Sequence, residues 1–546
     1  MVTPPTTNNS RVSEEGAGWR CDSPGTFERL WRRAHRFAPL RDRGRSLSWK
    51  APRTILAARN ELLVGLADPA NAQRRAWVAA QARAGVPKDL TVDRRELQAL
   101  SLVMLGDPGE GDRSQFAVLP PLEVMAEGTD LLFVCGDVVY PAGDVNEYVW
   151  KFHEPYGAQP RPIYAVPGNH DWDDGGLHGF MLHLCGVEAA PPEVARAVPR
   201  WLRTTLWRSP EPASGEALRR ARERHGSPRT RSGQPGPYFA LQTGPLLLVG
   251  IDTGFGRQID RDQARWLREV SMRPGPKVLV SSRPLYVDGR REPGEIEDAP
   301  GQSIDDIVRR PEHGYIAAIG GDVHNYQRYP VAVEGDRVIQ YIVNGGGGAF
   351  MSGTHAVDRV DIANANPALP PTREQDVRLY PLRGDSLAFF SRLYQEKLGS
   401  RRLLARLLAG RRLGGSPEGL ALPPPVARRL VSERCGLPTH GLDDVRVEPH
   451  HRAAAGIVFR LPAGPRGRRL YYSLWDWDHP PFFKSFLRLD ATAEQVRIRC
   501  VAATGCGEHE TEPPVEDEVS WSAGTGRWTV HSRPASDARE ADGAPR

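Results

Sequence analysis

Four short apolar runs constrain the fold of this chain most, because each leads within three residues to a glycine followed by aspartate or asparagine. Asp107 follows the run 102–105, Asp137 follows 131–135, Asn169 follows 163–166 and Asp322 follows 315–319. Two further apolar runs span 246–251 and 278–280. Short apolar runs that end in turn residues are typical of buried strands. The sequence therefore predicts an α/β core that begins at residue 101.

Polar residues that follow such strands are expected to meet at one edge of the sheet. In open α/β sheets the carboxyl ends of the strands converge with the loops beyond them, and ligands bind there. A single Gly-Asp after a strand is usually only a turn. Carboxylate, amide and imidazole groups from four strands would repel one another or stay unsatisfied without a cation. A metal centre is the simplest interpretation.

The order and spacing of these clusters resemble the motifs of the calcineurin-like metallophosphoesterase family over residues 102–348. Those motifs are Asp-x-His or Asp-x-Gly, Gly-Asp, Gly-Asn-His-Asp/Glu, a lone His and Gly-His-x-His. The Asp-x-Gly form at Asp107 and the stretch 321–328 are similar to the purple acid phosphatase branch. The resemblance implies a four-layer α/β/β/α sandwich of two mixed sheets, here with a helical lead-in and insertions.

The resemblance also implies a set of ligands for two divalent or trivalent metal ions, drawn from manganese, iron, magnesium and zinc. Asp107 and His324 would bind the first metal, Asp137 would bridge both, and Asn169 would bind the second through its amide oxygen. Tyr140 stands at the position of the tyrosine ligand of the purple acid phosphatase branch. The alternative for Tyr140 is a side chain that only packs.

His170 matches the family histidine that lies beside the metals without binding them. With Asn169 it would contact a phosphoryl oxygen, and it would help to protonate the leaving group. Asp171 would fix its tautomer and orientation. Arg328, four residues after His324, is a candidate to reach a substrate phosphate, and a surface ion pair is the alternative.

Two positions depart from the family pattern. Ser282 replaces a histidine ligand of the second metal, and Asp322 replaces the first histidine of Gly-His-x-His. Asp322 would leave an oxygen-rich second site, which favours manganese, magnesium, calcium or iron over zinc or copper. A centre with one metal, and an inactive member of the family, both remain open.

The expected function is hydrolysis of phosphate esters by a metal-bound hydroxide at a dinuclear centre. One alternative is a catalytically degenerate binding or scaffold protein that keeps the fold. Another is a nuclease, but the formal charge of +5 comes from 72 basic and 67 acidic residues and forms no concentrated basic footprint. The expected partner is therefore a phosphate ester, with no clear binding of nucleic acid; protein partners stay unknown.

Composition shifts divide the chain into segments. We predict a disordered tail at 1–25, a helical region at 26–100, and the metallophosphoesterase core at 101–357 with an insertion at 186–237. A second Arg- and Pro-rich insertion follows at 358–455, then strands at 456–506 that complete the core, then a disordered tail at 507–546. Within the second insertion, 401–412 predicts a helix packed on the body, or alternatively one that docks on a membrane surface or a polyanion.

The composition of the chain is typical of a soluble protein. Hydrophobic residues make up 40% and charged residues 25%, which is ordinary for a globular protein. The first thirty residues contain no apolar stretch of the kind a secretory signal needs, and nothing elsewhere approaches a transmembrane segment. The six cysteines form no Cys-x-x-Cys pair. We therefore expect a cytoplasmic protein with thiols mostly reduced.

Overall fold

The structure is a computed structural model that describes most of the chain between residues 47 and 531. The gaps are 64–68, 158, 188–200, 202–205, 225–231, 335–336, 358–360, 363–370, 398–421, 423, 436–445, 461–471, 474–481 and 506. The predicted tail 1–25 and the predicted helix 401–412 therefore lie outside the described residues.

In the described part of the chain, one sheet has the strand order β21-β20-β19-β18-β2-β3-β4. The strands β2, β3 and β4 run parallel. The other four form an antiparallel meander whose strand β18 pairs with β2. Their bounds are β2 (Leu100–Leu105), β3 (Leu131–Cys135), β4 (Ile163–Val166), β18 (Lys484–Ala491), β19 (Gln495–Ala503), β20 (Val515–Ser522) and β21 (Arg527–Val530).

The second sheet has the order β1-β5-β6-β8-β12-β14-β13-β17 among the described residues. Its central strands β6, β8, β12 and β14 are parallel, and β13 is antiparallel to both of its neighbours. The bounds are β1 (Thr91–Arg94), β5 (Phe239–Thr243), β6 (Leu247–Ile251), β8 (Lys277–Ser281), β12 (Tyr315–Gly320), β13 (Tyr326–Ala332), β14 (Val338–Asn344) and β17 (Arg378–Tyr380).

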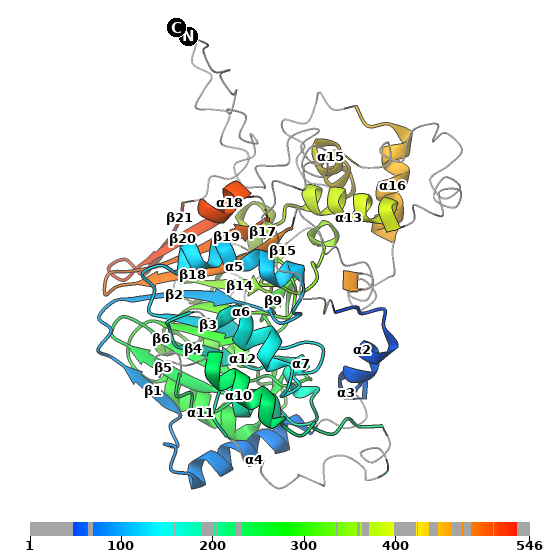
Figure 1. Cartoon of the computed structure of the whole chain (residues 1–546). Helices are drawn as coiled ribbons and strands as arrows, with labels where there is room; N and C mark the ends of the chain where they lie inside the picture. The colour runs from blue at the N-terminus through cyan, green and yellow to red at the C-terminus, as the bar shows by residue number, and fades with distance from the viewer. Residues whose placement is uncertain are drawn as a thin grey trace, which may run out of the picture.

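The two sheets pack face to face, and helices cover their outer faces (Figure 1). Alternate residues of β2 show this layering. Leu102 and Met104 join the core between the sheets, whereas Val103 packs on the other face with Leu122 of α5 (Arg113–Ala126). Because both faces are buried, the strand is apolar throughout. The four-layer sandwich predicted from the sequence is confirmed.

The helices on the second sheet begin at capping residues. The Asp260 carboxylate accepts the backbone amides of residues 262 and 263 at the start of α11 (Arg261–Ser271). Ser303 and Asp306 form a capping box at the start of α12 (Ile304–Arg309). The remaining helices are α2 (Pro52–Ala57), α3 (Arg59–Leu63), α4 (Ala70–Arg83), α6 (Glu154–Tyr156), α7 (Asn169–Trp172), α8 (His178–His183), α10 (Gly215–Arg224), α13 (Arg383–Lys397), α15 (Pro424–Cys435), α16 (Pro449–Arg460) and α18 (Gly507–Thr511).

Short strands lie in the loops of the second sheet and beyond it: β7 (Gln258–Ile259), β9 (Tyr286–Val287), β10 (Arg290–Arg291), β11 (Glu295–Ile296), β15 (Asp361–Ile362) and β16 (Thr372–Arg373). Helices α13, α15 and α16 group together at one end of the molecule, beyond the sheets (Figure 1). This group comes from the predicted second insertion.

Two segment predictions are corrected by the structure. The stretch from 507 was expected to be a disordered tail, but it contains α18, β20 and β21, because β20 pairs with β19 and extends the sheet. The apolar run 456–461 was expected to be a strand, but up to Arg460 it completes helix α16. A short apolar run does not distinguish a strand from a buried helix turn.

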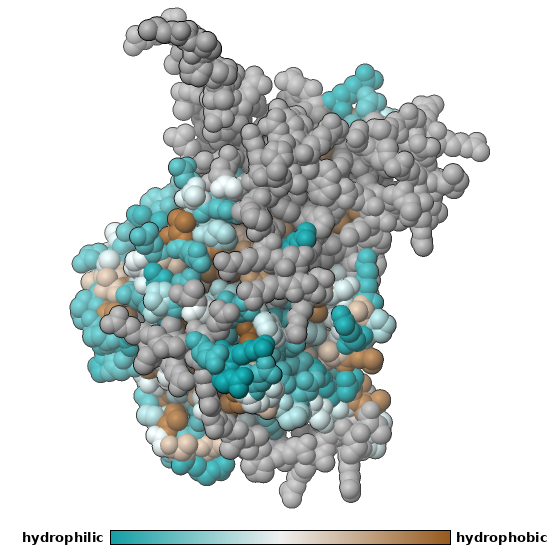
Figure 2. Space-filling model, viewed as in Figure 1, coloured by the Kyte–Doolittle hydropathy of each residue, from teal (hydrophilic) through white to brown (hydrophobic). Residues whose placement is uncertain are grey.

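One face of the described structure is mostly hydrophilic. Figure 2 shows hydrophilic residues over most of the described part of one face, with apolar residues scattered singly among them. Scattered apolar residues are normal on a folded protein and mark no interaction site. In the part of the chain that the structure describes, no helix combines the length and apolarity needed to cross a membrane.

Candidate metal centre

Three aspartates stand at strand ends and bring the two sheets together. Asp107 follows β2, Asp137 follows β3 and Asp322 follows β12. All three have left-handed backbone, with φ of 55°, 44° and 68°. The backbone amide of Asp322 donates to both carboxylate oxygens of Asp107, at 3.1 and 2.9 Å. The sharp turns therefore place carboxylates from both sheets at one edge, as predicted from the strand-end motifs.

Glycines keep the space around these carboxylates open. A Cβ atom on Gly168 would lie 2.0 Å from Oδ1 of Asp137. A Cβ on Gly321 or Gly345 would lie 2.7 or 2.8 Å from Oδ2 of Asp107. Any other residue at these three positions would collide with a carboxylate. The glycines of the motifs are therefore required by the close approach of the strand ends.

Tyr140 joins donors from both sheets. Its hydroxyl lies 2.9 Å from Oδ2 of Asp137 and 3.1 Å from Nε2 of His324. The other ring nitrogen of His324, Nδ1, lies 2.7 Å from the carbonyl oxygen of Phe350. Because a carbonyl only accepts, Nδ1 carries the proton and Nε2 has its lone pair directed at the cluster. Histidine ligands of metals are held in this way by a partner on the second nitrogen.

The electrostatics of the cluster favour a cation. Burial raises the pKa of the Asp107 carboxyl well above its ordinary value, and the charges of Asp137 and Asp322 raise it further. Burial also raises the pKa of Asp137 and of the Tyr140 hydroxyl. A metal ion would remove this repulsion and the desolvation cost together. The donor types of Asp107, Asp137, Tyr140 and His324 therefore suit a metal ion.

Helix α7 begins with Asn169 and His170 and points its first residues at the same edge. The backbone amide of His170 donates to Oδ1 of Asp137 at 2.9 Å. Within the described residues no hydrogen bond is made by the Asn169 side chain, although the residue is only 3% exposed. His170 directs Nδ1 at the carbonyl oxygen of Pro141, at 2.8 Å.

The role predicted for Asp171 is corrected. Its carboxylate accepts the backbone amides of Gly168, Val138 and Val139, and the Tyr148 hydroxyl. It therefore fastens two motif loops together. The carbonyl of Pro141 orients the His170 ring instead. Adjacent residues at the start of a helix point in different directions, so Asp171 does not reach the imidazole of its neighbour.

The role predicted for Arg328 is also corrected. This residue lies within β13, where it is 2% exposed, and its guanidinium forms a two-point ion pair with Asp517 of β20. The Tyr326 hydroxyl donates to the same carboxylate at 2.7 Å. Arg328 therefore joins the two sheets rather than binding substrate, and the alternative of a surface ion pair does not hold, because the pair is buried.

The position expected for a second cation has a different environment. Ser282 is buried and its hydroxyl lies 3.0 Å from that of Thr253. The Asp322 carboxylate accepts from Nη1 of Arg283 at 2.7 Å, and Nη2 of Arg257 lies 3.7 Å away. The sequence identified Ser282 and Asp322 as departures, but it did not reveal that arginines surround Asp322.

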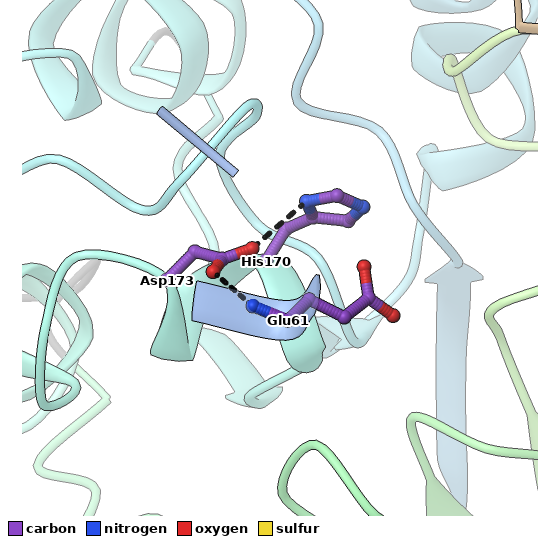
Figure 3. A group of neighbouring side chains, drawn as sticks. All are labelled: Glu61, His170 and Asp173. Carbon is purple, nitrogen blue, oxygen red and sulfur yellow. Dashed lines mark hydrogen bonds and ion pairs between the residues drawn. The ribbon is translucent and has the colours of Figure 1, made fainter. Parts of the chain in front are cut away.

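Two residues near the site, Trp49 and Glu61, were not predicted from the sequence. Both lie in the segment before residue 101, which contains none of the family motifs. Trp49 packs its ring on those of Tyr140 and His170, with centroids 6.0 and 5.4 Å apart. Glu61 of α3 donates its backbone amide to Asp173, whose other carboxylate oxygen lies 3.7 Å from Nδ1 of His170 (Figure 3). The side chains of Glu61, His170 and Asp173 place ligand atoms within 4.8 Å of one another.

Comparison with known proteins finds one family that part of the chain resembles. A model of the calcineurin-like phosphoesterase family matches residues 100–326. No curated protein sequence matches the chain significantly. Similar solved structures include purple acid phosphatase PPD1 from yellow lupin (Lupinus luteus) seeds, with 11% identity, 78% of this chain and 54% of that chain covered, and a TM-score of 0.36. This chain thus spans about half the length of the lupin protein.

A second similar structure is that of PhoD, with 10% identity over 80% of this chain and 72% of that chain, and a TM-score of 0.34. GAP50, the anchor in the inner membrane complex of Plasmodium, is 13% identical, covers 46% of this chain and 74% of its own, and has a TM-score of 0.30. The family match spans every strand-end motif described above. Residues 100–326, which contain the strand-end motifs, are therefore similar to the calcineurin-like phosphoesterase family.

Proposed function

We propose that this protein is a metal-dependent hydrolase of phosphate esters. The observation that carries the proposal is the position of the Tyr140 hydroxyl, 2.9 Å from Asp137 and 3.1 Å from His324. It brings an oxygen and a nitrogen donor from separate sheets to one point, beside the Asp107 carboxylate. Carboxylate, phenol and imidazole donors together suit iron or manganese.

The residues around this point support hydrolysis. When bound there, a cation would activate water and neutralise charge on the phosphoryl oxygens. The His170 ring is held through Nδ1 by Pro141, so that Nε2 is the atom that would pass a proton to the leaving oxygen. Water oxygen forms the new bond to phosphorus as the bond to the leaving oxygen breaks, and no residue is modified. Trp49 covers this region and would restrict access to it.

The test is hydrolysis of p-nitrophenyl phosphate and of its bis ester by metal-stripped protein, with iron, manganese, magnesium, zinc or calcium added back. We expect one or two of these metals to restore turnover. Asp137→Asn should lose turnover and bound metal together, whereas His170→Ala should keep the metal and lose turnover. No turnover with any metal, in a folded and metal-loaded protein, would refute the proposal.

The second candidate is a binding or scaffold protein that keeps the fold without turnover. Ser282 and Asp322 favour it, because neither residue offers the imidazole that the family pattern has at its position. It predicts a protein that binds metal and inorganic phosphate but hydrolyses neither ester. Phosphate binding measured by calorimetry beside the turnover assay distinguishes the two candidates.

A further inference from the structure

Two residues at the position of the expected second cation, Ser282 and Asp322, are already engaged by other side chains. The Ser282 hydroxyl is paired with that of Thr253, and both residues are 2% exposed. The Asp322 carboxylate lies between the guanidinium groups of Arg283 and Arg257. A cation bound to Asp322 would therefore lie beside positive charge, which repels it.

Arg283 is the nearer of the two arginines and is held from several sides. Nη1 donates to Asp322 at 2.7 Å, and Nη2 donates to the carbonyl of Phe255 at 3.2 Å and to Glu61 at 3.5 Å. The residue is 6% exposed. Its partners come from the loops after β6 and β12 and from helix α3, so the guanidinium has a fixed position.

Residues that adjoin Arg283 lie beside the proposed metal centre. Ser282, its neighbour in the chain, lies against the glycine that precedes Asp137, because a Cβ on Gly136 would be 2.6 Å from the Cβ of Ser282. Asp322, which binds Arg283, donates its own backbone amide to the Asp107 carboxylate. Arg283 is thus linked to the loop of Asp137 through its chain neighbour Ser282. It is linked to Asp107 through its ion-pair partner Asp322.

We propose that Arg283 takes the place of the second metal ion, so that the centre binds one cation and the buried guanidinium supplies the second positive charge for a phosphoryl group. This inference rests on the proposed function. A guanidinium keeps its charge at every working pH and presents several N–H donors in one plane, which matches phosphate oxygens. Asp322 then acts as a positioning residue for Arg283 and not as a metal ligand.

The first experiment counts metal ions. Stripped full-length protein is dialysed to equilibrium against iron or manganese, and its metal content is measured by elemental analysis. We expect one ion per chain at saturation. Two ions per chain, or none, would overturn the inference. The count needs no turnover, so it is independent of the hydrolysis assay that tests the proposed function.

The second experiment measures binding of inorganic phosphate to the metal-loaded protein by calorimetry. Arg283→Gln should weaken phosphate binding about tenfold or more, because a charged hydrogen-bond donor is lost, and should leave the metal count at one. Arg428→Gln is the matched control, since Arg428 also binds a buried aspartate, Asp385, but between helices α13 and α15. It should leave the phosphate affinity unchanged.

Equal phosphate affinities for Arg283→Gln and the wild type, or an equal loss in Arg428→Gln, would overturn the inference. If Arg283→Gln does not fold, Arg283→Lys carries the test. It keeps the charge but replaces the planar group by a single ammonium, so phosphate binding should fall without reaching zero. Wild-type affinity in that variant would count against the planar guanidinium as the phosphate ligand.

Discussion

At the scale of single residues, the three strand-end aspartates combine two unfavourable features. Left-handed backbone costs a non-glycine residue about 1 kcal/mol or more, and a buried carboxylate loses its hydration. The fold holds them by backbone hydrogen bonds, from Asp322 to Asp107 and from His170 to Asp137. Strain of this kind is concentrated at functional sites, where the arrangement itself is what the protein needs.

The raised pKa of Asp107 predicts a pH dependence of the metal-free protein. Its folded pKa lies above its ordinary value of 3.8, so above that pH the folded state binds more protons than the unfolded state. The contribution of Asp107 to stability therefore falls as pH rises through the interval between the two pKa values. Asp107→Asn should be more stable than the wild type without metal, by a margin that grows with pH.

Thermal melting of both proteins across this pH range checks the prediction. Added iron or manganese should raise the Tm of the wild type and have a smaller effect on the variant, which lacks one negative ligand. A margin between the two metal-free proteins that shrinks with rising pH would contradict the prediction.

Tyr140 gives a spectroscopic prediction. If ferric iron binds at the proposed centre, Tyr140 is a phenolate ligand, and a phenolate on ferric iron absorbs visible light. Tyr140→Phe should lose this absorption while keeping most of the iron, since Asp107, Asp137 and His324 remain. Tyr148→Phe is the control, because Tyr148 is equally buried but donates to Asp171. Colour that survives in Tyr140→Phe would assign the ligand elsewhere.

At the scale of elements, the start of α5 connects helix stability with the centre. The Asp112 carboxylate accepts the backbone amides of Ser114 and Gln115 and so caps the helix. The Ser114 hydroxyl in turn donates to the carbonyl of Gly348, in the glycine loop after β14. The loop that borders Asp107 is therefore fixed by the first turn of α5.

Asp112→Ala should lower the free energy of unfolding by about 1 kcal/mol, the usual cost of a lost cap. Denaturant unfolding followed by circular dichroism measures it. Glu123→Ala, on the exposed face of the same helix, should change the stability by less than about 0.5 kcal/mol. Similar losses in both variants would show that Asp112 contributes no more than an ordinary surface residue.

Strands and helices were predictable where the local pattern of apolar residues determines them. The apolar runs before Asp107, Asp137, Asn169 and Asp322 correspond to β2, β3, β4 and β12. Strands β20 and β21 were missed because Val515–Ser522 contains charged residues that hide its alternation, and pairing with β19 decides its structure. The strand predicted at 456–461 failed for the opposite reason, since tertiary packing continues a helix through it.

At the scale of the whole molecule, the buried pair of Arg328 and Asp517 fastens one sheet to the other. Asp517→Ala should destabilise the protein by about 3–5 kcal/mol, because it leaves a buried arginine without its partner. Glu518→Ala removes the neighbouring partly exposed pair with Arg497 and should cost less than about 1 kcal/mol. Comparable losses in both, measured by urea unfolding, would refute a special role for Asp517.

The candidate site was predictable only in part. Motif spacing identified Asp107, Asp137, His324 and their neighbours, because the carboxyl ends of the strands in an α/β sheet lie at one edge. It did not identify Trp49 or the arginine partners of Asp322. Those contacts join residues far apart in the chain, and no local pattern encodes which side chains meet across a sheet edge. The error over Arg328 has the same origin, since its partner lies 189 residues away.

Strand β18 lies beside β2 although nearly four hundred residues of chain separate them. The amide of Ser485 donates to the carbonyl of Gly346 at 2.9 Å, and the Lys484 side chain donates to the carbonyl of Ala349. The glycine loop beside Asp107 is therefore supported only after β18 has been synthesised and has paired with β2.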